Sequence, residues 1–160
     1  MLQFQYILMK AREEGCRMIY ADEFAVLGEE NTNYSWAPVN TSTMVSVNKR
    51  ERTFHCCIAM SEEKAEGLRI QNEPFTADNF QEFLRDHFKR YEVGEVEGDE
   101  KVLLVFDNAR QHVAKTSMGY LQQLQFGIIT VPPYTPEMNP VEIFIAVVKK
   151  KLLKHKADNL

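Results

Sequence analysis

The sequence lacks the segments that mark a membrane or secreted protein. No apolar stretch approaches the roughly 20 residues that a helix needs to cross a bilayer. The first residues, MLQFQYILMKAREEG, carry neither a basic leader nor a small-residue cleavage site. We therefore interpret this segment as a short helix, not as a signal peptide, and expect no association with a membrane.

Cysteines are few, and their spacing fits neither a small disulfide-stabilised domain nor a small zinc-stabilised domain. The three cysteines are Cys16, Cys56 and Cys57. Neighbouring residues of a strand point to opposite faces, so Cys56 and Cys57 are not expected to form a disulfide with each other. No zinc-ligand spacing is present. The pattern favours free thiols and an intracellular protein.

The chain also lacks an excess of positive charge, which is unfavourable for a protein that binds DNA on its own. Its net charge is −4, whereas contacts to phosphates require Lys and Arg. The charge is unevenly distributed, because residues 149–156 (KKKLLKHK) are basic and residues 92–100 (EVGEVEGDE) are acidic. A cluster of acids that binds divalent cations would lower the net charge without abolishing DNA binding.

No internal repeat, low-complexity segment or linker divides the chain, so we expect a single domain over residues 1–160. Strands are predicted at 17–25, 34–39, 52–60, 101–106 and 127–131, with 68–71 as an optional short strand beside them. Helices are predicted after Thr76 as N-cap, at 114–125 with Gly127 as C-cap, and at about 140–155, the last one basic. This order indicates an α/β protein with a mixed five-stranded sheet. An antiparallel meander precedes parallel strands, and helices cover both faces.

Three carboxylates occupy positions from which they can converge. Asp107 ends the apolar run 102–106, and Asp22 ends the shorter run 18–21. Glu142 is the third residue of the last predicted helix, for which Asn139 is the predicted N-cap. Carboxylates at strand ends and at a helix start can share one site, and carboxylate oxygens are the ligands that Mg²⁺ and Mn²⁺ prefer.

Each acid also has a structural interpretation. Glu142 is placed to complete a capping box with Asn139, and Asp107 is placed to form a strand-end turn. Glu23 competes with Asp22, because alternation along a strand directs only one of them toward the site. Taken singly, each acid is better explained by structure than by catalysis.

Four segments in order resemble one family. They are YADEF, YSWAPV, VFDNARQH and VPPYTPEMNPVEIF, and they span about residues 17–155. Together they resemble the catalytic domain of the DDE superfamily, most closely the mariner-type transposases and their bacterial insertion-sequence relatives. The separation of 34 residues between Asp107 and Glu142 also matches. The chain differs at Thr135, where members usually have Ser, and at Ile145, where many have Trp.

The resemblance implies a ribonuclease-H-like fold and a specific chemistry. Asp22, Asp107 and Glu142 fall on the three metal-binding catalytic acids of the family. They imply cleavage of DNA strands at transposon ends and strand transfer into target DNA, supported by Mg²⁺ or Mn²⁺ as two ions. A DNA-bound homodimer is implied, as is a DNA-recognition domain that this chain does not include. The implied location is the nucleus of a eukaryote or the cytoplasm of a bacterium.

The sequence also predicts roles for residues near the three acids and on the last helix. Asn108 and His112 are expected to orient ligands or to contact a phosphate, with packing as the alternative for His112. Lys149 and Lys150 are candidate contacts to the DNA backbone, with a solvated helix face as the alternative. Tyr134 is expected to pack within its loop. Two rival functions are a transposase-derived protein that binds without cutting and another ribonuclease-H-like nuclease.

Overall fold

The computed structural model describes residues 2–27, 38–40, 52–92, 100–124 and 126–157. A five-stranded sheet with the order β3-β2-β1-β4-β5 forms its centre. The strands are β1 (Arg17–Leu27), β2 (Thr53–Met60), β3 (Ala65–Gln71), β4 (Val102–Phe106) and β5 (Phe126–Thr130). Strands β1, β2 and β3 pair antiparallel, whereas β4 pairs parallel with both β1 and β5. The predicted mixed sheet, a meander followed by parallel strands, is confirmed.

The strand predicted at 34–39 is not part of the described sheet. Residues 34–37 lie outside the described residues, and Val39 and Asn40 form a turn. Asn40 has a φ of 68°, a left-handed conformation that Asn tolerates better than most residues. The third strand of the meander is instead β3, for which the sequence predicted only the short segment 68–71.

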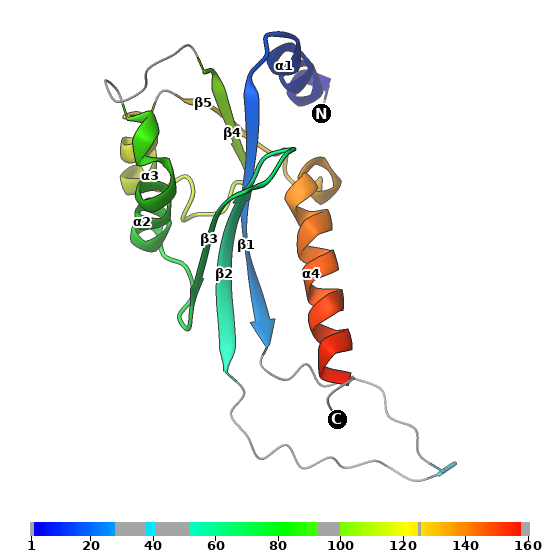
Figure 1. Ribbon diagram of the computed structural model, residues 1–160. Coiled ribbons are helices and arrows are strands. Elements are labelled where there is room, and N and C mark those ends of the chain that lie inside the picture. The colour runs from blue at the N-terminus through cyan, green and yellow to red at the C-terminus, as the bar shows by residue number, and fades with distance from the viewer. Residues whose placement is uncertain (1, 28–37, 41–51, 93–99, 125, 158–160) are drawn as a thin grey trace.

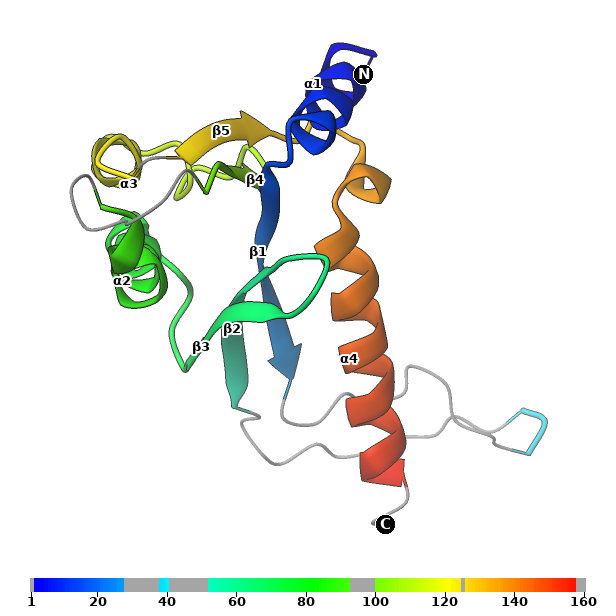
Figure 2. The ribbon, with the colours of Figure 1, turned by 45° about the horizontal axis from the view of Figure 1, so that its top comes forward.

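Helices cover both faces of the sheet, as predicted. They are α1 (Leu2–Glu13), α2 (Ala77–Phe88), α3 (Lys115–Leu121) and α4 (Pro140–Ala157), with 3₁₀ turns at Lys89–Tyr91 and Pro136–Met138. Helices α2 and α3 lie on one face, and α1 and α4 lie on the other (Figures 1 and 2). The predicted basic C-terminal helix is confirmed as α4.

Helix α3 is shorter than the predicted span 114–125. Gln122 is its C-cap, and the next two backbone N–H groups bond three residues back, in a tightening turn. Leu124 then bridges to Glu92, which turns the chain toward the sheet. Gly127 lies within β5, so its predicted role as C-cap is wrong.

Each face of the sheet has its own hydrophobic core. The core under α2 and α3 is rich in aromatic residues, among them Phe80, Phe83 and Phe106. The core under α1 and α4 contains Met18 and Tyr20 from β1. Because side chains alternate along a strand, consecutive residues of β1 serve different cores, and this alternation decides where its acids point.

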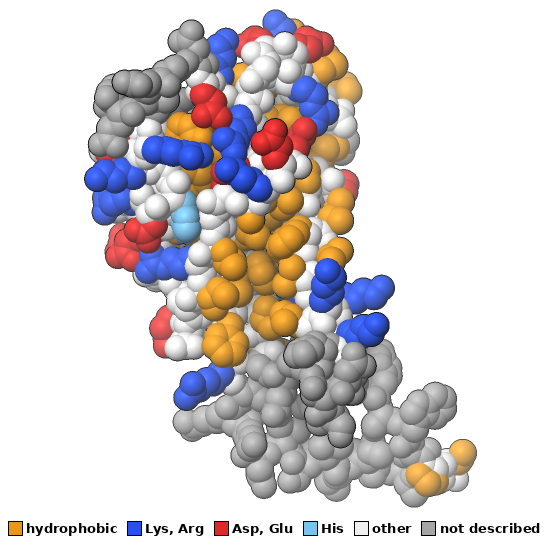
Figure 3. All heavy atoms as spheres, in the orientation of Figure 1, with side chains coloured by type: hydrophobic (Ala, Val, Ile, Leu, Met, Phe, Trp, Pro, Cys, Tyr) orange, Lys and Arg blue, Asp and Glu red, His pale blue; other side chains and the backbone are white. Residues whose placement is uncertain are grey.

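Helix α4 buries some of its apolar side chains and exposes others. Val141 and Ile145 are buried, but Phe144 and Leu152 are exposed. Apolar side chains also gather over β2, β3 and α4 in Figure 3. Leu68 and Ile70 of β3 are both exposed to solvent. In the described part of the chain, no helix combines the length and apolarity that crossing a bilayer requires.

The predicted N-cap of α2 provides a test of the fold. Thr76 Oγ1 accepts a hydrogen bond from Asn79 N at 3.3 Å, and Asn79 Oδ1 accepts one from Thr76 N at 3.4 Å. We expect Thr76→Ala to lower the free energy of unfolding by about 1 kcal/mol in urea titrations. Thr76→Ser, which keeps the hydroxyl, is the control, and equal stability of the two variants would contradict the assignment.

Candidate active site

Three acids from three separate elements line one cavity of about 330 Å³. They are Asp22 of β1, Asp107 directly after β4, and Glu142 in the first turn of α4. The structure therefore brings together the three carboxylates that the sequence singled out. The cavity lies beyond the carboxyl end of a parallel strand, where open α/β sheets commonly bind ligands.

Asp22 is not at the end of its strand, contrary to the sequence prediction. Strand β1 continues to Leu27 in register with β2. Its parallel pairing with β4, however, ends at the pair Tyr20 and Val105. Asp22 thus lies just past the point where β1 and β4 separate. This position is equivalent to the strand end that the sequence predicted.

The choice between Asp22 and Glu23 is settled by the alternation of β1. Asp22 is only 7% exposed and faces α4, where its Oδ2 accepts a hydrogen bond from Asn139 Nδ2 at 3.0 Å. Its Oδ1 accepts one from the backbone N of Glu23 at 2.8 Å. The side chain of Glu23 lies on the opposite face of the sheet, beside His112. Asp22 is therefore the β1 carboxylate of the cavity.

Asn139 connects the helix that carries Glu142 to β1. Its Oδ1 accepts a hydrogen bond from Val141 N at 3.4 Å, in the cap of α4, while its Nδ2 holds Asp22. Asn139 is 2% exposed. The sequence identified it as a helix cap but not as a residue of the site. The only signal for this second role was its place in the Asn-Pro-x-Glu segment.

The proline-rich loop before α4 is held by two side chains. Thr135 Oγ1 donates to the carbonyl of Pro132 at 2.7 Å, and Asn108 Nδ2 donates to the carbonyl of Val131 at 3.1 Å. Thr135 thus keeps the hydroxyl that Ser would supply. Tyr134, which lines the cavity, is 100% exposed with a φ of 62°. The expectation that Tyr134 packs within the loop is wrong, and the residue that the loop buries is its neighbour Thr135.

Asp107 is held from behind by His112. Nδ1 of His112 lies 2.7 Å from Asp107 Oδ1, which also accepts a hydrogen bond from Ala109 N at 2.9 Å. The contact with His112 is the main reason that the pKa of Asp107 is lowered. Burial lowers the pKa of His112, but the adjacent Asp107 and Glu23 outweigh burial and raise it to about 9. His112 is fully buried, so the expectation that it contacts a phosphate is wrong and its orienting role remains.

The candidate lysines lie apart from this cavity. Lys149 and Lys150 are on α4 and are not among the residues that line it. Lys149 follows Glu142 by seven residues, which places it about 10 Å along the helix axis on nearly the same face. Lys150 lies on an adjacent face of the helix.

The chemistry of the cavity suits a divalent cation. Burial, and next the charge of Asp107, raises the pKa of Asp22 to about 7, with Glu142 adding to the effect. An ionised Asp22 therefore lacks compensating positive charge, which a cation bound to oxygen ligands would supply. Among the described residues, no three His, Cys, Asp or Glu side chains are close enough to hold one ion. A complete ligand set would thus require side-chain movement, for which the exposed Glu142 is best placed.

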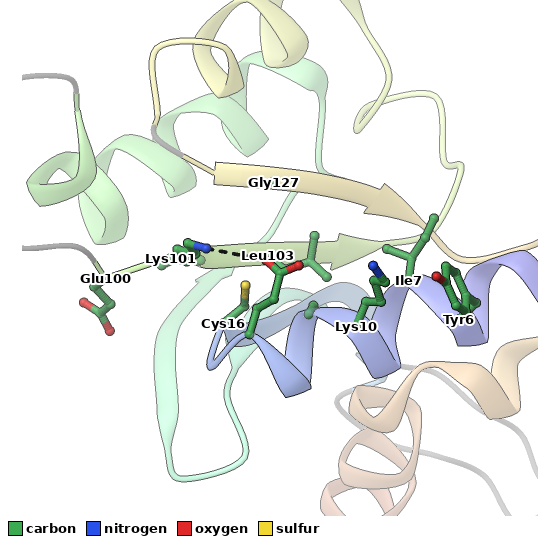
Figure 4. A pocket seen from close by; sticks show the side chains of 11 residues that line it. Tyr6, Ile7, Lys10, Cys16, Glu100, Lys101, Leu103 and Gly127 are labelled. Atoms are coloured by element: carbon green, nitrogen blue, oxygen red, sulfur yellow. Dashed lines mark hydrogen bonds and ion pairs between the residues drawn. The ribbon is translucent and has the colours of Figure 1, made fainter.

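A larger cavity of about 840 Å³ lies between α1 and the β4–β5 edge of the sheet (Figure 4). Lys10, Glu14 and Cys16 line it on one side, with Lys101 and Gly127 on the other. It contains none of the three acids and is located at the amino ends of β1 and β4. The larger cavity is therefore not the candidate active site, because the three carboxylates line the smaller one.

Comparisons with known proteins agree on one family and fold. Residues 17–160 match the family described as DDE superfamily endonuclease. The fold is similar to Mos1 transposase in a paired-end complex with the left transposon end, with a TM-score of 0.68 and 16% identity over 92% of this chain and 46% of that chain. It is also similar to the isolated catalytic domain of Mos1 mariner transposase, with a TM-score of 0.61 and 14% identity over 94% of this chain and 67% of that one.

A third similar structure is an intasome of simian T-cell lymphotropic virus in complex with PP2A regulatory subunit B56 gamma. Its TM-score is 0.59, with 12% identity over 89% of this chain and 41% of that one. No match was found among curated proteins. At these identities the structural likeness establishes the fold, which is the ribonuclease-H-like architecture that the sequence predicted. The chain spans about half the length of the Mos1 chain in the paired-end complex.

The raised pKa of Asp22 predicts that the metal-free protein loses stability as the pH rises. A carboxyl with a pKa raised from 3.8 to about 7 stabilises the fold at low pH, and this contribution is lost as the pH rises toward 7. We expect Asp22→Asn to be more stable than wild type at pH 8 in EDTA, by at most about 4 kcal/mol, and similar near pH 4, the usual pKa of the carboxyl. Urea unfolding at both pH values measures this. Greater stability of the wild type at pH 8 would contradict the assigned environment.

Proposed function

The chain belongs to the DDE superfamily of endonucleases, and on this basis we propose that it is the catalytic part of a transposase. It cleaves DNA strands at transposon ends and joins them to target DNA. The observation that carries the proposal is the convergence of Asp22, Asp107 and Glu142 on one cavity from β1, β4 and α4. The likeness to Mos1 transposase in a complex with a transposon end supports it.

Asp22, Asp107 and Glu142 would hold Mg²⁺ or Mn²⁺, as two ions. Such ions, when bound, activate the attacking water or 3′-hydroxyl and stabilise the departing oxygen. The donor set supports this, because three carboxylates offer only hard oxygen ligands. Mos1 structures containing Mn and Mg also have this fold.

The three acids would divide the work according to their surroundings. Asp22 is fixed by Asn139, and Asp107 is fixed by His112 and the backbone of Ala109. Glu142 is exposed on the first turn of α4. Two acids are therefore in place before a cation enters, and the third would turn toward it afterwards. Preset ligands lower the conformational entropy that binding would otherwise cost.

DNA would approach the open side of the cavity. The exposed ring of Tyr134 lies at its edge, and Lys149 on α4 would extend the contact along the DNA backbone, with Lys150 beside it. The chain spans about half the length of the Mos1 transposase it matches. Recognition of transposon ends and pairing of two subunits are therefore proposed for the protein as a whole.

Two rival functions use the same fold. A transposase-derived protein that binds without cutting has no need of three acids in one cavity, and their presence favours cleavage. Another ribonuclease-H-like nuclease would keep the acids but act on a different substrate, such as RNA in a hybrid. The substrate that is cleaved therefore distinguishes this nuclease from a transposase. Whether DNA is cut at all distinguishes the non-cutting protein from a transposase.

The first test is Asp107→Asn in a Mn²⁺-dependent nicking assay on DNA that carries the transposon end. Even residues that only support metal ligands change activity by 10- to 100-fold, so we expect the loss to exceed about 100-fold. Asp86→Asn on α2 is the matched control, because Asp86 is exposed, 3.8 Å from Arg69, and outside the cavity. Nicking by Asp107→Asn at the wild-type rate would refute the proposal, and cleavage of RNA–DNA hybrid alone would favour the rival nuclease.

The second test uses the unusual backbone of Tyr134. Its φ of 62° is strained for a residue with a side chain, at a cost of roughly 1–2 kcal/mol. Tyr134→Gly relieves that strain but adds freedom to the unfolded chain. We expect unfolding free energy within about 1 kcal/mol of wild type, together with weaker DNA binding and slower cleavage. Unchanged DNA binding, measured by fluorescence anisotropy, would exclude Tyr134 from the DNA contact.

A further inference from the structure

Behind the candidate active site, three ionisable side chains form a row that begins with Glu23, on the face of the sheet covered by α2, and ends with Asp107 at the cavity. His112 Nδ1 lies 2.7 Å from Asp107 Oδ1, and His112 Nε2 lies 2.8 Å from Glu23 Oε2. One imidazole thus contacts a carboxylate on each side. Asp107 lines the cavity of the acids, whereas Glu23 does not.

The middle of this row is fixed by aromatic packing. The imidazole of His112 is fully buried, with its centroid 4.3 Å from the ring of Phe80 and 5.2 Å from that of Phe106. At the far end, Gln111 Nε2 donates to Glu23 Oε2 at 3.2 Å. The packed ring holds one nitrogen against Glu23 and the other against Asp107, and so connects the two carboxylates.

We propose that Glu23 is a positioning residue that sets the orientation of the Asp107 carboxylate, acting through His112, before a cation binds. The proposal rests on the proposed function, since it assigns Asp107 to the cation. His112 and the backbone N of Ala109 both engage Oδ1 of Asp107. These two contacts leave Oδ2 to face a cation in the cavity.

Packing alone does not explain an acid at this position. Glu23 Oε1 and His112 Nε2 are both buried without a hydrogen-bond partner among the described residues. The 2.8 Å approach of His112 Nε2 to Glu23 Oε2 is therefore a contact between charges, not an aligned hydrogen bond. An unsatisfied buried carboxylate oxygen is costly, and an apolar side chain of similar size would avoid that cost. What a neutral side chain cannot supply is the negative charge that holds the imidazole in contact with both partners.

The test is Glu23→Gln, which keeps the shape and removes the charge. Mn²⁺ binding to the protein alone is measured by electron paramagnetic resonance, and unfolding is measured in EDTA. We expect Mn²⁺ affinity to fall by 10- to 100-fold, the usual effect of losing a group that orients a ligand. Cleavage of DNA is expected to recover at saturating Mn²⁺. Glu82→Gln is the matched control, because Glu82 pairs with Arg69 on the surface of α2.

The outcomes are distinct. Wild-type Mn²⁺ affinity in Glu23→Gln, with binding lost in Asp107→Asn, overturns the role of Glu23 and leaves the proposed function intact. If the wild-type protein binds no Mn²⁺, the proposed function fails and the positioning role fails with it. Should Glu23→Gln unfold too readily for titration, Gln111→Ala releases the same carboxylate. Weaker Mn²⁺ binding then supports the proposal, and unchanged binding overturns it.

Discussion

The side-chain amide of Asn139 is the contact on which the geometry of the site depends. Its oxygen accepts a hydrogen bond in the first turn of α4, and its nitrogen donates to Asp22 on β1. One buried residue thereby fixes the start of the helix that carries Glu142 against the strand that carries Asp22. Both elements pack into the same core through Val141 and Tyr20. The cavity therefore inherits its rigidity from the fold.

Charge governs the rest of the site. Three carboxylates share a cavity, and the pKa values of two of them are shifted in opposite directions. Burial and neighbouring charge raise the pKa of Asp22, while contact with His112 lowers that of Asp107. Positive charge is thus supplied to one acid from within the protein. For the other it has to come from outside, as a cation would provide.

Much of the fold was predictable, because local patterns determine it. The apolar run before Asp107 predicted the fully buried strand β4, and the Asn-Pro-x-Glu segment predicted the start of α4. What failed depends on tertiary contacts. Tyr134 is exposed while its neighbour Thr135 bonds to the loop backbone, and α3 ends shortly before Leu124 bridges to Glu92.

The residues of the site were likewise predictable from local sequence only in part, because some depend on tertiary contacts. Runs and spacing singled out the three acids, and the resemblance to the DDE superfamily assigned them to catalysis, but alternation alone left Asp22 and Glu23 as equals. Only the sheet, with α4 on one face and His112 on the other, assigns them different partners. Contacts between residues 89 positions apart, such as His112 with Glu23, leave no trace in local sequence.

The most direct measurement is a crystal structure of the protein soaked in Mn²⁺, with the ions located by anomalous scattering. We predict manganese between Asp22 and Asp107, with Glu142 turned toward it. Manganese bound elsewhere, with these three side chains still separate and hydrated, would contradict the central claim that they form one metal-binding site.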